Sequence, residues 1–181
     1  RRLVDDTEIR VRRQLAFSLG EWDSPTAGEL LGHLAKASAG QPNLQAAIAS
    51  SAVGHSTQIL DPLLAQHQAG GTTKLMTAML RLAAIEAESV DVKKLLLSLT
   101  RDATELEPWR MEGLSGLLAH AQKRQLPLDE LLNNANIEKT VRAMVGNARA
   151  KPRDRAAALE LLCSLPGERR ELESLLAGQL T

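Results

Sequence analysis

Apolar residues recur along the chain at the three- and four-residue steps that place side chains on one face of an α-helix. The first such set is Val11, Leu15, Leu19 and Trp22. Asp5 or Asp6 suits the start of this helix, and Gly20 suits its end. We therefore predict a helix that ends near Gly20, with Trp22 packed across the turn that follows.

The same pattern continues to the C-terminus. Ser24 and Pro25 are typical of an N-cap and a first helical position, and a further helix is expected from about Asn43. Asp61-Pro62 predicts a restart or a kink, and Thr72 is expected to cap a helix after a stop at residues 70–71. The positions expected to face the core include Ala27, Leu30, Leu31, Leu34, Leu75, Met76, Met79, Leu80, Leu82, Ala83, Val92, Leu95, Leu96, Leu99, Leu114, Leu117, Leu118, Ala121, Ile137, Val141, Met144, Val145, Ala148 and Leu161.

These segments add up to about eleven helices joined by short turns of Gly, Pro, Ser or Asp, with no convincing strand. Paired helices restart every ~30 to 45 residues, which is the spacing of an α-solenoid. The predicted fold class is all-α: an α-α superhelix of the HEAT or armadillo type, built from antiparallel helix pairs. No Pro/Gly/Ser-rich linker interrupts residues 1–181, so we predict one domain.

The amino-acid composition of the chain limits the classes of function that it can have. Apolar residues make up 44 % and aromatic residues only 2 %, which favours a closely packed core of Leu and Ala. Basic and acidic residues balance at 22 each, so there is no electrostatic footprint for nucleic acid or an anionic membrane. No apolar run approaches the ~20 residues that span a bilayer. Cys163 is the single cysteine, which excludes an intrachain disulfide, and its apolar neighbours predict a buried thiol.

The residues that could act in catalysis, bind a metal or bind phosphate are scattered along the sequence. The histidines have no metal-binding spacing, and we expect them to be solvated or to pack between helices; they are His33, His55, His67 and His120. No serine lies in a Gly-x-Ser-x-Gly elbow, and the sequence AGGTTK at 69–74 lacks the spacing of a phosphate-binding loop. We therefore predict no catalytic residue, no metal site and no cofactor.

The stretch VRRQLAFSLG at 11–20 resembles the first helix of a HEAT repeat, and PRDRAAALELL from Pro152 repeats the form more loosely. The resemblance implies small residues that let paired helices approach closely, and polar ladders of Asp and Arg between successive repeats. The middle of the chain matches only by helix length and pairing.

A narrower resemblance covers most of the chain, through residues 9–35, 43–55 and 109–124. These stretches are similar to the helical segment of large haem-binding, membrane-bound-dehydrogenase-like proteins of planctomycetes and their relatives. The resemblance implies a fragment of a multidomain protein in a periplasmic or extracytoplasmic location, between a β-propeller part and a c-type cytochrome domain. Cys163 is followed by Ser-Leu-Pro, so no haem is expected to attach covalently within residues 1–181.

We therefore expect a non-catalytic scaffold for protein–protein or interdomain contacts, with a concave surface lined by the second helix of each pair. The Pro108-Trp109 pair opens a helix, where packing of Trp109 within the first turn is the commoner arrangement. For this residue, the alternative is a partly exposed Trp109 that contacts a partner. The alternative is a HEAT-like nucleic-acid-binding protein, or an enzyme such as a DNA glycosylase or a phycobilin lyase, which needs a groove with a carboxylate and basic or aromatic walls. The candidate surface residues are His33, Lys36, His67, Lys93, Lys94, Trp109, Arg169 and Arg170.

Overall fold

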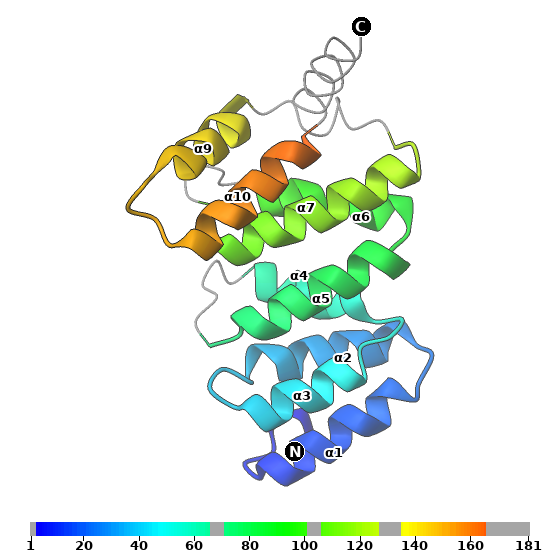
Figure 1. The fold of residues 1–181 in the computed structure, drawn as a ribbon. Helices are drawn as coiled ribbons and strands as arrows, with labels where there is room; N and C mark the ends of the chain where they lie inside the picture. Colours follow the sequence, from blue (N-terminus) through cyan, green and yellow to red (C-terminus); the bar gives the residue numbers. More distant parts are fainter. Residues whose placement is uncertain (1–2, 66–70, 101–105, 127–134, 166–181) are drawn as a thin grey trace, which may run out of the picture. The chain divides into compact units, whose positions relative to one another are not determined.

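Helices account for all the regular secondary structure that the structure describes. The computed structural model describes residues 3–65, 71–100, 106–126 and 135–165. Within these ranges it contains nine α-helices, one short 3-10 helix and no strand (Figure 1). The prediction of an all-α protein is therefore confirmed.

The chain divides into two compact units, Arg1–Asp91 and Val92–Thr181. The first unit contains η1 (Leu3–Asp5), α1 (Ile9–Gly20), α2 (Pro25–Lys36), α3 (Pro42–Ser50), α4 (Ser56–Leu64) and α5 (Thr73–Glu86). Helix α6 (Ser89–Thr100) begins at the boundary, and the second unit continues with α7 (Pro108–Lys123), α9 (Ala135–Gly146) and α10 (Pro152–Ser164). The short helix expected over 126–134 lies almost wholly outside the described residues, and the final helix expected from 168 lies wholly outside them.

Proline sets the start of four of these helices. Pro25, Pro42, Pro108 and Pro152 are the first residues of α2, α3, α7 and α10. The first N–H of a helix has no partner within the helix, so proline loses nothing there, and its fixed φ already suits the helix. The predicted start of α2 after Ser24 is confirmed.

In the first unit, the first three helices each pack against the helix two positions further along the chain. Helix α1 contacts α3, α3 contacts α5, and α2 contacts α4. Consecutive helices also pack, as α1 does with α2 and α4 does with α5. Figure 1 shows the result as two rows, with α1, α3 and α5 in one row and α2 and α4 in the other.

Two glycines allow α2 and α4 to approach closely. A Cβ atom added at Gly28 would lie 2.9 Å from Gln58 Cβ, and one added at Gly32 would lie 2.8 Å from Pro62 Cγ. The predicted restart at residues 61–62 is not found, because α4 runs through Pro62 to Leu64. Pro62 has no N–H to donate to the carbonyl oxygen of Gln58, and this oxygen lies beside Gly32.

Leu and Ala make up most of the buried core, as the composition predicts, and Ile, Met and Val side chains complete it together with Trp109. Leu31, Leu96 and Leu161 are fully buried, which confirms their predicted positions. The regular stripes of α6 and α7 are also buried as predicted: Val92, Leu95, Leu96, Leu99, Leu114, Leu117, Leu118 and Ala121. Elsewhere the predicted faces are only partly buried: Leu30, Leu82, Met144 and Val145 are half-buried, and Ala148, which lies beyond the end of α9, is exposed.

The predicted apolar face of α1 is wrong at both ends. Ala16 and Leu19 are buried, whereas Val11 and Trp22 are exposed. The helix ends at Gly20, so Trp22 lies in the following turn and no longer follows the helical period. The capping prediction is also wrong: Glu8 is the N-cap, and Asp6 Oδ1 accepts the Glu8 N–H at 2.8 Å.

In the second unit, α10 packs against both α7 and α9. Gln122 Nε2 donates to the carbonyl oxygen of Ser164 at 2.9 Å, and the hydroxyl groups of Ser115 and Ser164 lie 3.0 Å apart. Cys163 is exposed rather than buried. It follows buried Leu161 by two positions, and a two-residue step turns a helical side chain to the opposite side.

Candidate interaction surface

The first pair of candidate residues lies on the last turn of α2. His33 and Lys36 are exposed there. Basic side chains near a helix C-terminus interact favourably with the helix dipole, so this position has a structural explanation as well as a functional one. Both side chains are accessible to a partner.

The second pair lies on α6. Lys93 is half-buried and Lys94 is exposed, beside the buried side chains of Val92 and Leu95. The pair therefore occupies the solvent side of α6, whereas His33 and Lys36 belong to a helix of the first unit. His67, Arg169 and Arg170 lie outside the described residues.

Trp109, one of the candidate surface residues, is buried at the start of α7. Its side chain is 6 % exposed, and its Nε1 donates a hydrogen bond to Glu107 Oε2 at 2.7 Å. The guanidinium of Arg110 lies 5.4 Å from the ring centroid, within cation–π range. Trp109 is therefore packed at the start of α7, as the commoner arrangement predicts, and the alternative of a partly exposed contact residue is wrong.

One histidine joins two turns of the first unit. His55 is buried, and its Nε2 lies 3.0 Å from the carbonyl oxygen of Trp22. This contact ties the residues before α4 to the turn between α1 and α2. It agrees with the prediction that the histidines pack between helices, but the sequence did not single out His55 or its partner.

His120 lies near the end of α7 and has a lowered pKa. Burial lowers the pKa of His120 below its ordinary value of 6.5, and the positive charges of Arg124 and Lys123 lower it further. Its Nε2 is buried and has no hydrogen-bond partner among the described residues. These conditions favour the neutral imidazole.

Gln45 joins the turns at the other end of the first unit. Its Nε2 donates to the carbonyl oxygens of Ser38 at 3.0 Å and Gly71 at 2.7 Å. Beside it is a hollow of about 310 Å³. Its wall is Gly40, Gln41, Pro42, Gln45, Gly71, Thr73 and Lys74, a set with one charged side chain and no acid–base pair.

The described parts of the chain contain no group of three or more His, Cys, Asp or Glu side chains that could hold a metal ion. Among the same residues, no helix is both long enough and apolar enough to cross a membrane. Comparison with family profiles, with curated proteins and with solved structures finds no match to this chain. The function is therefore inferred from the chain's own surfaces.

Proposed function

We propose that this protein is a non-catalytic helical-repeat scaffold that binds a protein partner or the flanking domains of a larger polypeptide. The observation that carries the proposal is the packing of α1 on α3, α3 on α5 and α2 on α4. In a repeat array, each helix pair buries its apolar face against the next pair, so contacts between every second helix are expected.

On this proposal, residues 1–181 form one α-α superhelix of about eleven helices. The likeness of VRRQLAFSLG to a HEAT repeat supports the same interpretation. The proposal includes the larger context that the resemblance implies, in which the chain spaces the propeller-like and haem-carrying parts of an extracytoplasmic protein.

Two properties disfavour the alternative of a nucleic-acid-binding protein or a glycosylase-type enzyme. The net charge is zero, whereas phosphate binding draws on an excess of Lys and Arg. Aromatic residues make up 2 % of the chain, and Trp109, one of the two tryptophans, is buried. Enzymes that act on an extruded base stack it between aromatic or apolar side chains.

Cys163 provides a direct test, because it is exposed and is the single cysteine of the chain. The chain is biotinylated at this thiol, incubated with a lysate of its source organism, and the retained proteins are identified. Each candidate is then purified and titrated against the chain at physiological salt. A partner that rebinds with fixed stoichiometry supports the scaffold.

Beads that carry an unrelated helical protein of similar size, biotinylated in the same way, serve as the control. In parallel, the chain is titrated with duplex DNA at low salt. If no purified candidate rebinds and DNA binds with a steep salt dependence, the nucleic-acid alternative replaces the scaffold.

A further inference from the structure

Three large apolar side chains are exposed where the helices of one row of the first unit end. Trp22 is 58 % exposed, Val53 is 72 % exposed and Ile85 is 77 % exposed. Trp22 follows α1, Val53 follows α3, and Ile85 lies in the last turn of α5. They follow one another at about 32 residues, which is the length of one helix pair.

Contacts between the turns show that these three side chains belong to one edge. His55 joins the turn of Val53 to the carbonyl oxygen of Trp22 at 3.0 Å. The Gly54 N–H donates to Glu86 Oε2 at 3.1 Å, which ties the same turn to the end of α5. We call the surface formed by residues 20–25, 51–56 and 84–91 the turn edge.

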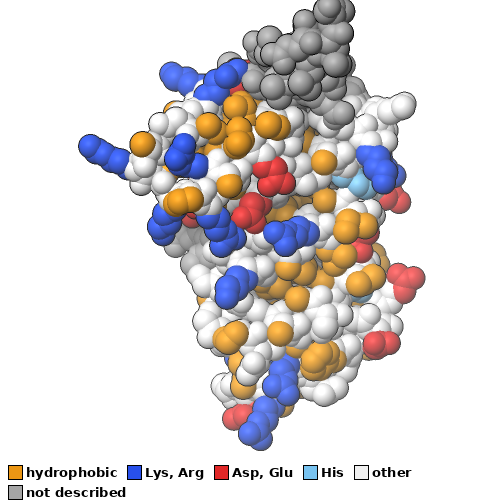
Figure 2. Space-filling model, in the orientation of Figure 1, with side chains coloured by type: hydrophobic (Ala, Val, Ile, Leu, Met, Phe, Trp, Pro, Cys, Tyr) orange, Lys and Arg blue, Asp and Glu red, His pale blue; other side chains and the backbone are white. Residues whose placement is uncertain are grey.

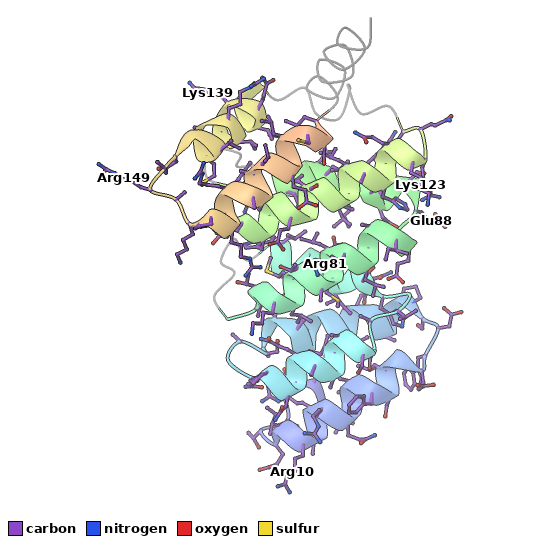
Figure 3. All side chains as sticks on the ribbon, in the orientation of Figure 1. Arg10, Arg81, Glu88, Lys123, Lys139 and Arg149 are labelled. Carbon is purple, nitrogen blue, oxygen red and sulfur yellow. The ribbon has the colours of Figure 1, made fainter. Side chains whose placement is uncertain are left out.

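The charges of the turn edge all have one sign. Its ionisable side chains, apart from buried His55, are Glu21, Asp23, Glu86, Glu88 and Asp91. The nearest basic residues along the chain are Arg81 and Lys93, outside these segments. Figure 2 shows acidic side chains along the side of this unit where α1, α3 and α5 end, and Figure 3 places Glu88 on this side.

Local structure explains only some of these carboxylates. Glu86 accepts the Gly54 N–H, and Asp91 lies in the first turn of α6, where an acidic side chain is favourable. Glu21, Asp23 and Glu88 are exposed, and among the described residues their side chains have no hydrogen-bond or ion-pair partner. They are therefore available to a positively charged partner.

We propose that the turn edge is a docking surface for a protein segment that presents Lys or Arg between large aliphatic side chains. The inference rests on the proposed scaffold function and names its binding surface. Burial of Trp22, Val53 and Ile85 provides the affinity, since exposed apolar side chains rimmed by polar groups are typical of protein interfaces. The five carboxylates select the charge of the partner and speed its approach, while they repel anionic surfaces such as nucleic acid.

Trp22 is itself a reporter for the test. The full chain is titrated with a fluorescein-labelled amphipathic peptide of Lys and Leu, and both peptide anisotropy and tryptophan emission are recorded. We expect saturable binding with a blue shift of the emission, because Trp22 becomes buried whereas Trp109 is buried already. Raising the salt from ~0.05 to ~0.5 M is expected to weaken binding about tenfold. A Lys/Ser peptide of the same charge and a Glu/Leu peptide should bind at least about tenfold more weakly.

Charge reversal locates the binding to the turn edge. The double variant Glu21→Lys/Glu88→Lys is expected to bind the Lys/Leu peptide at least about tenfold more weakly. The matched control, Asp5→Lys/Glu160→Lys, makes the same change in net charge at two exposed positions outside the turn edge and should bind within about twofold of the wild type. Thermal melts followed by circular dichroism confirm that both variants fold.

Four results would overturn the proposal. The first is equal binding of the Lys/Leu and Lys/Ser peptides. The second is an equal loss of affinity for the Lys/Leu peptide in the two double variants. The third is self-association of the chain that Glu21→Lys/Glu88→Lys abolishes, which would assign the turn edge to a second copy. A captured partner that binds both double variants equally would retain the scaffold and reject the turn edge as its binding surface.

Discussion

Gly32 of α2 lies directly against Pro62 of α4. A Cβ atom at position 32 would come within 2.8 Å of both Pro62 Cγ and the carbonyl oxygen of Gln58. Real Cβ contacts are almost never this short, so the absence of a side chain at Gly32 sets the distance between the two helices. The same applies at Gly28, one turn earlier on α2.

Gly32→Ala is therefore expected to destabilise the protein by about 1–3 kcal/mol, because α4 has to shift to make room for the methyl group. Gly146→Ala is the matched control, since Gly146 ends α9 and a Cβ there meets nothing within 4 Å. Alanine is the better helix former, so this control should be neutral or stabilising by up to ~1 kcal/mol. Urea unfolding measures both, and equal midpoints would contradict the close approach of α2 and α4.

Leucines that are close together on the same helix differ in burial, and this difference can be tested by mutation. Leu96→Ala and Leu161→Ala should each cost ~2–5 kcal/mol, because both side chains are fully buried. Leu97→Ala and Leu159→Ala remove the same atoms from exposed positions and should cost less than ~0.5 kcal/mol. The free energy of unfolding of the four variants tests these values. If Leu96→Ala and Leu97→Ala, or Leu161→Ala and Leu159→Ala, had similar effects, the core would have been assigned to the wrong helix face.

Helical periodicity predicted the core where helices are long and regular, and failed where they end. The stripe of α6 is buried as expected, including Leu95, Leu96 and Leu99. The helical period assigns Trp22 to the stripe of α1, because the period carries no information on where a helix stops. The apolar neighbours of Cys163 predict a buried thiol, although the geometry of α10 turns it toward solvent.

Features that depend on tertiary contacts could not be read from the sequence. His33 and Lys36 are exposed as expected, but Trp109 is held by Glu107, and a two-residue spacing does not indicate such a bond. The turn edge joins Trp22, Val53 and Ile85, which are separated by whole helix pairs. Their spacing of about 32 residues is present in the sequence, but only the packing of the helices shows that they share an edge.

Cys163 is expected to react with a maleimide or with a disulfide reagent in the native protein, because its thiol is exposed. One thiol per chain should be modified at a rate within about tenfold of that in denaturant. Cys163→Ser provides the blank. If the thiol reacted only after unfolding, Cys163 would be buried in the native protein, as its apolar neighbours predict.

The lowered pKa of His120 predicts a loss of stability on mild acidification. As the pH falls below the ordinary value of 6.5, the unfolded chain binds this proton before the native chain does, so the equilibrium shifts toward unfolding. His120→Gln removes this contribution. The stability of the wild type relative to His120→Gln should therefore decrease from neutral pH to about pH 5, by a small amount because His120 is partly exposed. Chemical unfolding measures the free energy of unfolding of both proteins at each pH. If the two free energies changed in parallel with pH, the lowered pKa of His120 would be contradicted.

The central claim, that the first unit is a stacked array of helix pairs, is tested most directly by distances between its helices. Spin labels are placed two at a time at Gln14, Ala46 and Ala78, exposed positions on α1, α3 and α5, in a Cys163→Ser background. Neighbouring packed helices lie ~8–10 Å apart, so the array predicts two similar short distances, Gln14 to Ala46 and Ala46 to Ala78. The distance from Gln14 to Ala78 should be roughly their sum. Three similar distances would indicate a closed bundle and would contradict the account.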